Sequence, residues 1–96
     1  MAEQLLDVSD LEAPEPLLKA IDALQALPEG DYLRFCHRMK PCHLYRYLDE
    51  NGYCADTRQG RRCECEVFIW QEQDGRAAAH AAAAAAQLPP WPKESM

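Results

Sequence analysis

The spacing of apolar residues divides residues 4–71 into two helices and four strands. The clearest helix follows Pro16, where apolar side chains recur every three or four residues and mark one buried face. The Pro-Glu-Gly sequence at residues 28–30 ends that helix. A shorter helix is predicted for residues 42–51, with Gly52 as its C-cap. The two apolar faces consist of Leu17, Ala20, Ile21, Leu24 and Leu27, and of Leu44, Tyr47 and Leu48.

Alternation of apolar and polar residues predicts strands at residues 4–8, 31–37, 53–58 and 61–71. In the second strand, Leu33 and Phe35 lie on one side of the sheet, and Tyr32, Arg34 and Cys36 on the other. The last strand alternates most regularly. One of its faces is formed by Cys63, Cys65, Val67 and Ile69, and the other by Arg62, Glu64, Glu66, Phe68 and Trp70.

The resulting element order is β-α-β-α-β-β, which predicts an α+β fold. Helices and strands in this order form a two-layer α/β sandwich around a mixed four-stranded sheet. Right-handed crossovers place both helices on the same face of the sheet. The other face is expected to be open to water, with Phe68 and Trp70 exposed on it.

The composition changes after residue 72, so a domain at residues 1–72 and a tail at residues 73–96 are predicted. The tail holds nine alanines between Ala77 and Ala86, followed by a Pro-Pro-Trp-Pro sequence. Alanine favours helix, but an isolated helix of this length is marginal in water. We therefore expect a flexible Ala/Pro-rich tail that is frayed or transiently helical. Its Pro-rich end is either a plain terminus or a ligand for an aromatic groove.

Length and charge limit the classes of function. A chain of 96 residues forms one small domain, and its net charge of −6 disfavours binding to polyanions. The first 30 residues carry seven acidic and one basic side chain, without the features of a secretory signal. No apolar stretch is long enough to span a membrane. A cytoplasmic location, with the five cysteines as reduced thiols, is expected.

Four short motifs occur in a characteristic order: Ala13-Pro14-Glu15-Pro16 with the following two leucines, then residues 27–34, 37–45 and 67–70. In this order the chain resembles the TusA/SirA-like superfamily. The similarity is to a bacterial branch of unknown function, domain of unknown function 2249. The resemblance implies a TusA-like fold over residues 4–71. It also implies that Ala13 occupies the position where relatives carry sulfur on the cysteine of a Cys-Pro-x-Pro motif. An alanine methyl group cannot carry a persulfide, so that activity does not transfer.

The clearest candidate for metal chemistry is the segment that joins the second strand to the second helix. It contains two Cys-His pairs, Cys36-His37 and Cys42-His43, and these residue types bind zinc, iron and copper. Neighbouring strand residues point to opposite faces, so His37, Cys42 and His43 are the three that can converge on a transition metal. The alternative is a buried structural cysteine flanked by loop histidines.

Cys42 is also a candidate reactive thiol. It lies at the start of the second helix, where the helix dipole and nearby Lys40 favour a thiolate. The loop containing Cys42 is expected to approach the helix-entry turn of Ala13, Pro14, Glu15 and Pro16. Glu15 and Lys40 would then set the local charge. The Cys63-x-Cys65 pair is expected to be core packing, and Cys54 has no evident partner.

The sequence leaves three functions open. It contains no phosphate-binding loop, nucleophile elbow or metalloprotease motif, so a conventional enzyme with a small-molecule substrate is not expected. The favoured function is a non-enzymatic accessory module in sulfur, redox or metal handling. The second is a protein-interaction module that uses the Phe68/Trp70 surface and the tail. The third is weak nucleic-acid binding by the face that carries Arg34, Arg62, Phe68 and Trp70, although Glu64 and Glu66 share that face.

Overall fold

The computed structural model describes residues 2–92 and contains four strands and three helices in this range. The strands are β1 (Glu3–Asp7), β2 (Tyr32–His37), β3 (Tyr53–Gln59) and β4 (Cys65–Gln71). The helices are α1 (Glu15–Gln25), α2 (Cys42–Glu50) and α3 (Gly75–Ala85). No helix among the described residues has the length and apolar character needed to cross a membrane.

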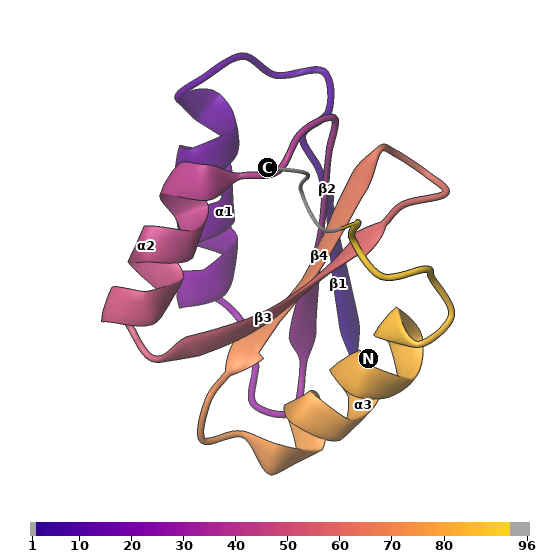
Figure 1. Cartoon of the computed structure of the whole chain (residues 1–96). Helices are drawn as coiled ribbons and strands as arrows, with labels where there is room; N and C mark the ends of the chain where they lie inside the picture. Colours follow the sequence, from indigo (N-terminus) through magenta and orange to yellow (C-terminus); the bar gives the residue numbers. More distant parts are fainter. Residues whose placement is uncertain (1, 93–96) are drawn as a thin grey trace.

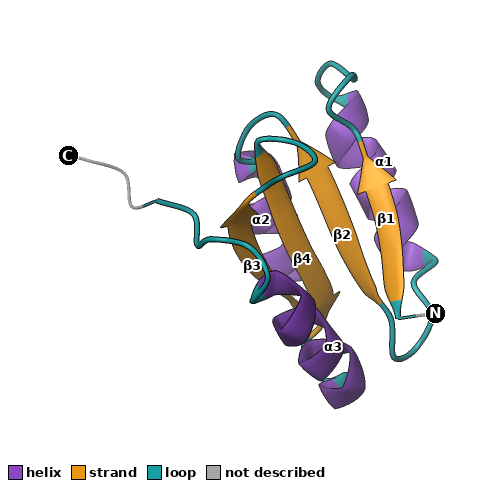
Figure 2. Cartoon of the chain, turned by 90° about the vertical axis from the view of Figure 1, so that its right-hand side faces the viewer, coloured by secondary structure: helices purple, strands orange, loops and turns teal. Residues whose placement is uncertain are grey.

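The strands form one mixed sheet in the order β1-β2-β4-β3. β1 and β2 are parallel, whereas β4 is antiparallel to both β2 and β3. Figure 2 shows α1 and α2 together behind this sheet. The predicted α+β fold, with a mixed four-stranded sheet and both predicted helices on one face, is confirmed.

The main core lies between the sheet and the helix pair α1/α2. α1 contributes Ala20 and Leu24, which are one helical turn apart and fully buried, and α2 contributes Leu44 and Leu48 in the same way. Pro14 and Pro16 flank the first residue of α1, where a missing backbone N–H leaves no intrahelical bond unmade. Gly52 follows α2 with φ of +76°, the left-handed conformation expected of a helix C-cap. The sheet side of this core is formed by Leu33, Phe35, Cys65, Val67 and Ile69.

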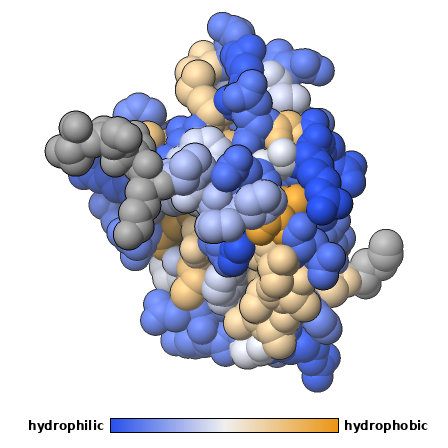
Figure 3. All heavy atoms as spheres, turned by 45° about the vertical axis from the view of Figure 1, so that its right-hand side comes forward, coloured by the Kyte–Doolittle hydropathy of each residue, from blue (hydrophilic) through white to orange (hydrophobic). Residues whose placement is uncertain are grey.

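The second face of the sheet is covered in part by α3, so the prediction that this face is open to water is wrong. α3 lies on the side of the sheet opposite α1 and α2 (Figures 1 and 2). Ala77, Ala81 and Ala85 form its buried stripe, one turn apart. In Figure 3 pale-orange apolar atoms gather over α3 on this side of the molecule. The second core cluster combines this stripe with strand residues and consists of Tyr32, Phe68, Ala81, Ala85 and Leu88.

The alanine-rich segment forms an ordered helix because tertiary contacts add to alanine's helix propensity. The Asp74 side chain caps α3 by accepting a hydrogen bond from the N–H of Ala77 at 3.0 Å. Beyond α3 the chain runs along the free edge of β3. There the N–H of Gln59 donates to the carbonyl of Pro89 at 3.0 Å, and Trp91 packs against the main core. The last predicted tail residues, 93–96, lie outside the described residues.

Candidate thiol site at the β3–β4 turn

Glu66 is a fully buried carboxylate at the start of β4. Its Oε1 accepts a hydrogen bond from Nε of Arg34 at 2.6 Å. Its Oε2 accepts from the backbone N–H groups of Arg61 at 2.9 Å and Arg62 at 3.3 Å. These two bonds fold residues 61 and 62 back over the sheet. For this reason β4 begins at Cys65, and the prediction that it begins at residue 61 is wrong.

The charge of Glu66 is stabilised by its neighbours. Burial alone would raise its pKa, but the hydrogen bonds from Arg34 and from the two backbone amides outweigh burial and hold the pKa below its usual range. Arg34 also lies 3.4 Å from Glu3, and its guanidinium carbon lies 5.1 Å from the centre of the Phe68 ring. An ionised Glu66 and an ionised Arg34 therefore form an ion pair in which the carboxylate is fully buried and the guanidinium is partly exposed.

Two cysteines adjoin this ion pair. Cys36 on β2 is the direct cross-strand partner of Glu66 and is fully buried. Cys63 comes from the β3–β4 turn, is partly exposed, and lies close to Cys36 on the same side of the sheet. The two sulfur atoms and a carboxylate oxygen of Glu66 all lie within 4.8 Å of one another. Over residues 2–92, no other group of three or more His, Cys, Asp or Glu side chains is as close. We call these three residues the thiol site.

Both thiols of the site are held in their neutral form. Burial, followed by the neighbouring Cys63, raises the pKa of Cys36 far above its ordinary value. Burial also raises the pKa of Cys63, although a hydrogen bond with Cys36 acts in the opposite direction. The thiol of Cys63 also donates to the carbonyl oxygen of Cys65 at 3.2 Å. At neutral pH the pair is therefore a protected dithiol and not an activated nucleophile.

Cys63 was predicted to share the face of Cys65 beneath α1 and α2, and this prediction is wrong. Cys65 does lie there, in the main core. Cys63 precedes the first residue of β4 and belongs to the turn that Glu66 organises. Strand alternation therefore does not extend to it, and the turn carries it to the opposite face, beside Cys36.

Gly60 makes room for this turn. A Cβ atom at residue 60 would lie 2.1 Å from the carbonyl oxygen of Cys63 and 2.7 Å from Cγ of Glu66. We expect Gly60→Ala to destabilise the protein by about 1–3 kcal/mol, because backbone and a buried side chain must both shift. Gly75→Ala is the matched control, since a Cβ there meets nothing within 4 Å. Urea denaturation of both variants checks this, and equal midpoints would contradict the tight packing of the turn.

The structure separates the three predicted metal ligands. His37 is buried at the end of β2, where its ring lies 5.9 Å from that of Phe35 and its Nδ1 has no hydrogen-bond partner. Burial lowers its pKa. Cys42 and His43 are exposed as the first two residues of α2. His37, Cys42 and His43 do not come together in a group of ligand atoms within 4.8 Å.

At one end of the molecule the β2–α2 loop contacts residues 11 and 12, which come just before the helix-entry turn, and the expected approach of the loop to the turn itself stays a prediction. Nη2 of Arg38 reaches across, 2.8 Å from the Glu12 carboxylate and 3.3 Å from the carbonyl oxygen of Leu11. The turn itself consists of Ala13, Pro14, Glu15 and Pro16, of which only Pro16 is buried. The ammonium of Lys40 lies 5.7 Å from the centre of the Tyr45 ring on α2. This end of the molecule carries the exposed thiol of Cys42, and the reactivity of that thiol stays a prediction.

The aromatic surface proposed for a partner or a nucleic acid is not available on the second face. Phe68 is fully buried in the second core cluster, and Trp70 packs against that cluster. Arg34 is paired with Glu66 and Glu3. The prediction of an exposed Phe68/Trp70 surface is therefore wrong, because α3 occupies it.

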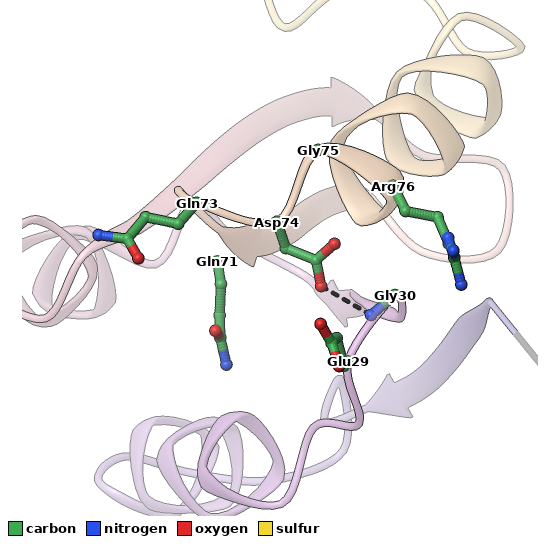
Figure 4. A pocket seen from close by; sticks show the side chains of 7 residues that line it. All are labelled: Glu29, Gly30, Gln71, Gln73, Asp74, Gly75 and Arg76. Carbon is green, nitrogen blue, oxygen red and sulfur yellow. Dashed lines mark hydrogen bonds between the residues drawn. The ribbon is translucent and has the colours of Figure 1, made fainter.

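A polar hollow lies at the opposite end of the sheet, where β2 begins and β4 ends (Figure 4). Asp74 lies at its centre and accepts a hydrogen bond from the N–H of Gly30 at 2.6 Å. Hydrogen bonds from Gly30 and Ala77 lower the pKa of this carboxyl group. The polar groups of this hollow thus join the start of α3 to the sheet. The lining of the hollow contains neither cysteine nor histidine. The lining residues are Glu29, Gly30, Gln71, Gln73, Asp74, Gly75 and Arg76.

Comparison with known proteins gives one match. The family model described as "Uncharacterized conserved protein (DUF2249)" matches residues 5–71. This range runs from β1 to the end of β4 and contains all three residues of the thiol site, whereas α3 lies beyond it. No curated protein and no solved structure matches the chain.

Proposed function

Since the chain belongs to the uncharacterised DUF2249 family, we propose a function from its own geometry: a small non-enzymatic accessory module in thiol redox chemistry. Cys36 and Cys63 would alternate between a dithiol and a disulfide. The observation that carries this proposal is that Cys63, a partly exposed residue, lies beside the fully buried Cys36 with their sulfur atoms within 4.8 Å of each other. A reducing bacterial cytoplasm is the proposed setting, in which the pair rests as the dithiol.

The oxidant would be a disulfide RS–SR, either a small molecule or a partner protein. Cys63 loses its proton and attacks one sulfur of RS–SR, which forms a mixed disulfide and releases one thiolate. Cys36 then loses its proton and attacks Cys63, which forms the Cys36–Cys63 bond and releases the second thiolate. The two released thiolates take up the two protons. The pair thus gives up two electrons and two protons, and RS–SR becomes two RSH.

The surroundings support this order of attack. Cys63 lies in a turn without strand pairing, so it can move toward Cys36. Cys36 is fixed within β2, between β1 and β4. Because burial raises the pKa of both thiols, the thiolate fraction is small near neutral pH. The initial rate of oxidation is therefore expected to increase as the pH is raised from neutral toward the pKa of Cys63.

The fold also supports a proposed relationship to TusA/SirA-like proteins. The β-α-β-α-β-β order and the two-proline entry to α1 agree with the expectation from the sequence. Persulfide transfer at the helix-entry turn is not part of the proposal, because Ala13 provides no thiol there. The sulfur chemistry would instead belong to the opposite face of the sheet, at Cys36 and Cys63.

Oxidation with glutathione disulfide tests the proposal. The variant Cys42→Ser/Cys54→Ser removes the other two thiols that are not fully buried. We expect it to lose about 2 Da on oxidation, as two hydrogens leave, with the new bond mapped to Cys36 and Cys63. Adding Cys63→Ser should prevent the mass loss. A mixed disulfide that persists at Cys63, or a bond to Cys65 instead, would overturn the proposal.

A further inference from the structure

We propose that Cys36, Cys63 and Glu66 form a binding site for a soft divalent metal ion of the zinc class. The site goes beyond the redox proposal because it also uses the Glu66 carboxylate, which disulfide formation does not need. Two sulfur atoms and one carboxylate oxygen within 4.8 Å of one another form a donor set of the kind that binds zinc.

The distances allow an ion to bind with a small adjustment. Zinc–sulfur bonds of about 2.3 Å place tetrahedral ligand atoms about 3.8 Å apart. The two sulfur atoms therefore need to approach each other by no more than about 1 Å. Zinc–oxygen bonds are shorter, at about 2.0–2.2 Å, so each sulfur and the carboxylate oxygen need to approach by no more than about 1.3 Å. Cys36 and Glu66 are directly paired across β2 and β4 and hold their positions. Cys63 lies in the turn and supplies the movement.

Charge balance favours a divalent ion. Before binding, the buried group contains two neutral thiols and the oppositely charged pair of Arg34 and Glu66. When the ion binds, both thiols lose their protons, and two new negative charges meet two positive charges. The buried group therefore stays neutral as a whole, whereas a monovalent ion would leave one negative charge uncompensated away from water.

The surroundings also orient the carboxylate ligand. Arg34 binds Oε1 and the two turn amides bind Oε2, so the carboxylate plane is fixed before an ion arrives. Oε1 accepts one hydrogen bond in the structure and keeps a second lone pair. Three protein ligands leave a fourth position for water or a ligand from a partner, on the side where Cys63 is partly exposed. Hard ions such as Mg²⁺ prefer all-oxygen sites and are not expected to bind here.

Titration of the reduced protein with Co²⁺ tests the site directly. Co²⁺ serves as a spectroscopic substitute for Zn²⁺, and bound thiolates give an intense near-ultraviolet charge-transfer band. We expect one Co²⁺ per chain with this band, displaced by Zn²⁺. Cys63→Ser should weaken binding at least about tenfold, a lower bound taken from the loss seen when even outer-shell partners are removed. Cys42→Ser is the matched control and should bind like the unmodified chain.

The Co²⁺ titrations distinguish the thiol site from a site in the β2–α2 loop. The absence of the band, or its full retention in Cys63→Ser, would overturn the proposal. Loss of the band in Cys42→Ser would also overturn it and would move the ion to the β2–α2 loop. Cys63→Ser tests ion binding and not folding, because the Cys63 side chain lies in the turn and its replacement leaves the ion pair of Glu66 and Arg34 intact. If the Cys36–Cys63 disulfide forms with glutathione disulfide but no Co²⁺ binds, the redox proposal is supported and the metal site is rejected. If Co²⁺ binds but no disulfide forms, the metal site is supported and the redox proposal is rejected.

Discussion

Replacing Glu66 by alanine is expected to lower the free energy of unfolding by about 3 kcal/mol or more. The change removes the partner of Arg34, whose side chain is only 19% exposed, and leaves that guanidinium without its 2.6 Å contact. It also removes the acceptor for the backbone N–H groups of Arg61 and Arg62. Arg34 keeps its ion pair with Glu3 at 3.4 Å. The expected loss of stability is therefore at the lower end of the range of about 3–5 kcal/mol that is typical when one partner of a buried ion pair is removed.

Glu64→Ala provides the control for the Glu66 variant. Glu64 is exposed, carries the same charge and lies two residues earlier, so its removal should change stability by no more than about 0.5 kcal/mol. Urea denaturation followed by circular dichroism measures both values. A Glu66 variant as stable as the Glu64 variant would show that the buried pair does not organise the turn.

The same pair predicts sensitivity to acid. The pKa of Glu66 is lower in the folded protein than in the unfolded chain, so the folded state favours the ionised form. Its contribution to stability is fully present above the unfolded pKa of about 4.3. That contribution is lost as the pH falls through the folded pKa. Unfolding midpoints measured between pH 3 and 7 should fall less in the Glu66 variant than in the unmodified chain.

The layout of the sheet could be predicted because period-two alternation reports directly which face is buried. Leu33 and Phe35 lie in the main core, and Tyr32, Arg34 and Cys36 lie on the other face, as their alternation indicates. The helix faces follow in the same way from spacings of three and four residues. These signals are local in the sequence, so they do not depend on contacts between distant segments of the chain.

The thiol site could not be predicted because its geometry depends on one long-range carboxylate. The sequence pattern predicts one strand over residues 61–71, and the period of two in that strand assigns Cys63 to the face of Cys65. Glu66 overrides the pattern by binding the amides of the two preceding arginines. The available signal was Gly60, since glycine is the usual residue where another group approaches the backbone closely. Alternation assigned Cys36 and Glu66 to the same face of the sheet. It could not show that they are direct neighbours, because that depends on the register between β2 and β4, which is known only from the fold.

The tail was predicted to be frayed or transiently helical, and the packing of α3 on the sheet was not predicted because alanine gives a weak hydrophobic signal. Ala77, Ala81, Ala85 and Leu88 recur at helical spacing, yet each alanine buries little surface by itself. The predicted exposure of Phe68 and Trp70 was the stronger clue, because a large apolar patch on a sheet face requires a cover. The alanines provide that cover, and their small size lets the helix lie close to the strands.

Replacing Ala81 by aspartate is expected to have the second large effect, a loss of about 3–5 kcal/mol or detachment of α3 from the sheet. Ala81 is fully buried in the cluster that contains Phe68 and Leu88. A carboxylate there would be charged, unpaired and away from water. If α3 detaches instead, the loss equals its docking energy, and the helical circular dichroism signal should fall because an isolated alanine helix of this length is marginal.

Ala82→Asp separates burial from helix propensity. Ala82 is the next residue of the same helix and is exposed, so both variants bear the same intrinsic cost of aspartate, about 0.7 kcal/mol or less. The difference in unfolding free energy between the two variants therefore measures the docking of α3 alone. If both variants unfold at the same urea concentration, α3 does not stabilise the fold, and residues 1–72 form the complete domain as the composition predicted. If only Ala81→Asp is destabilised, the folding unit extends beyond the family match at residue 71 and includes the alanine helix.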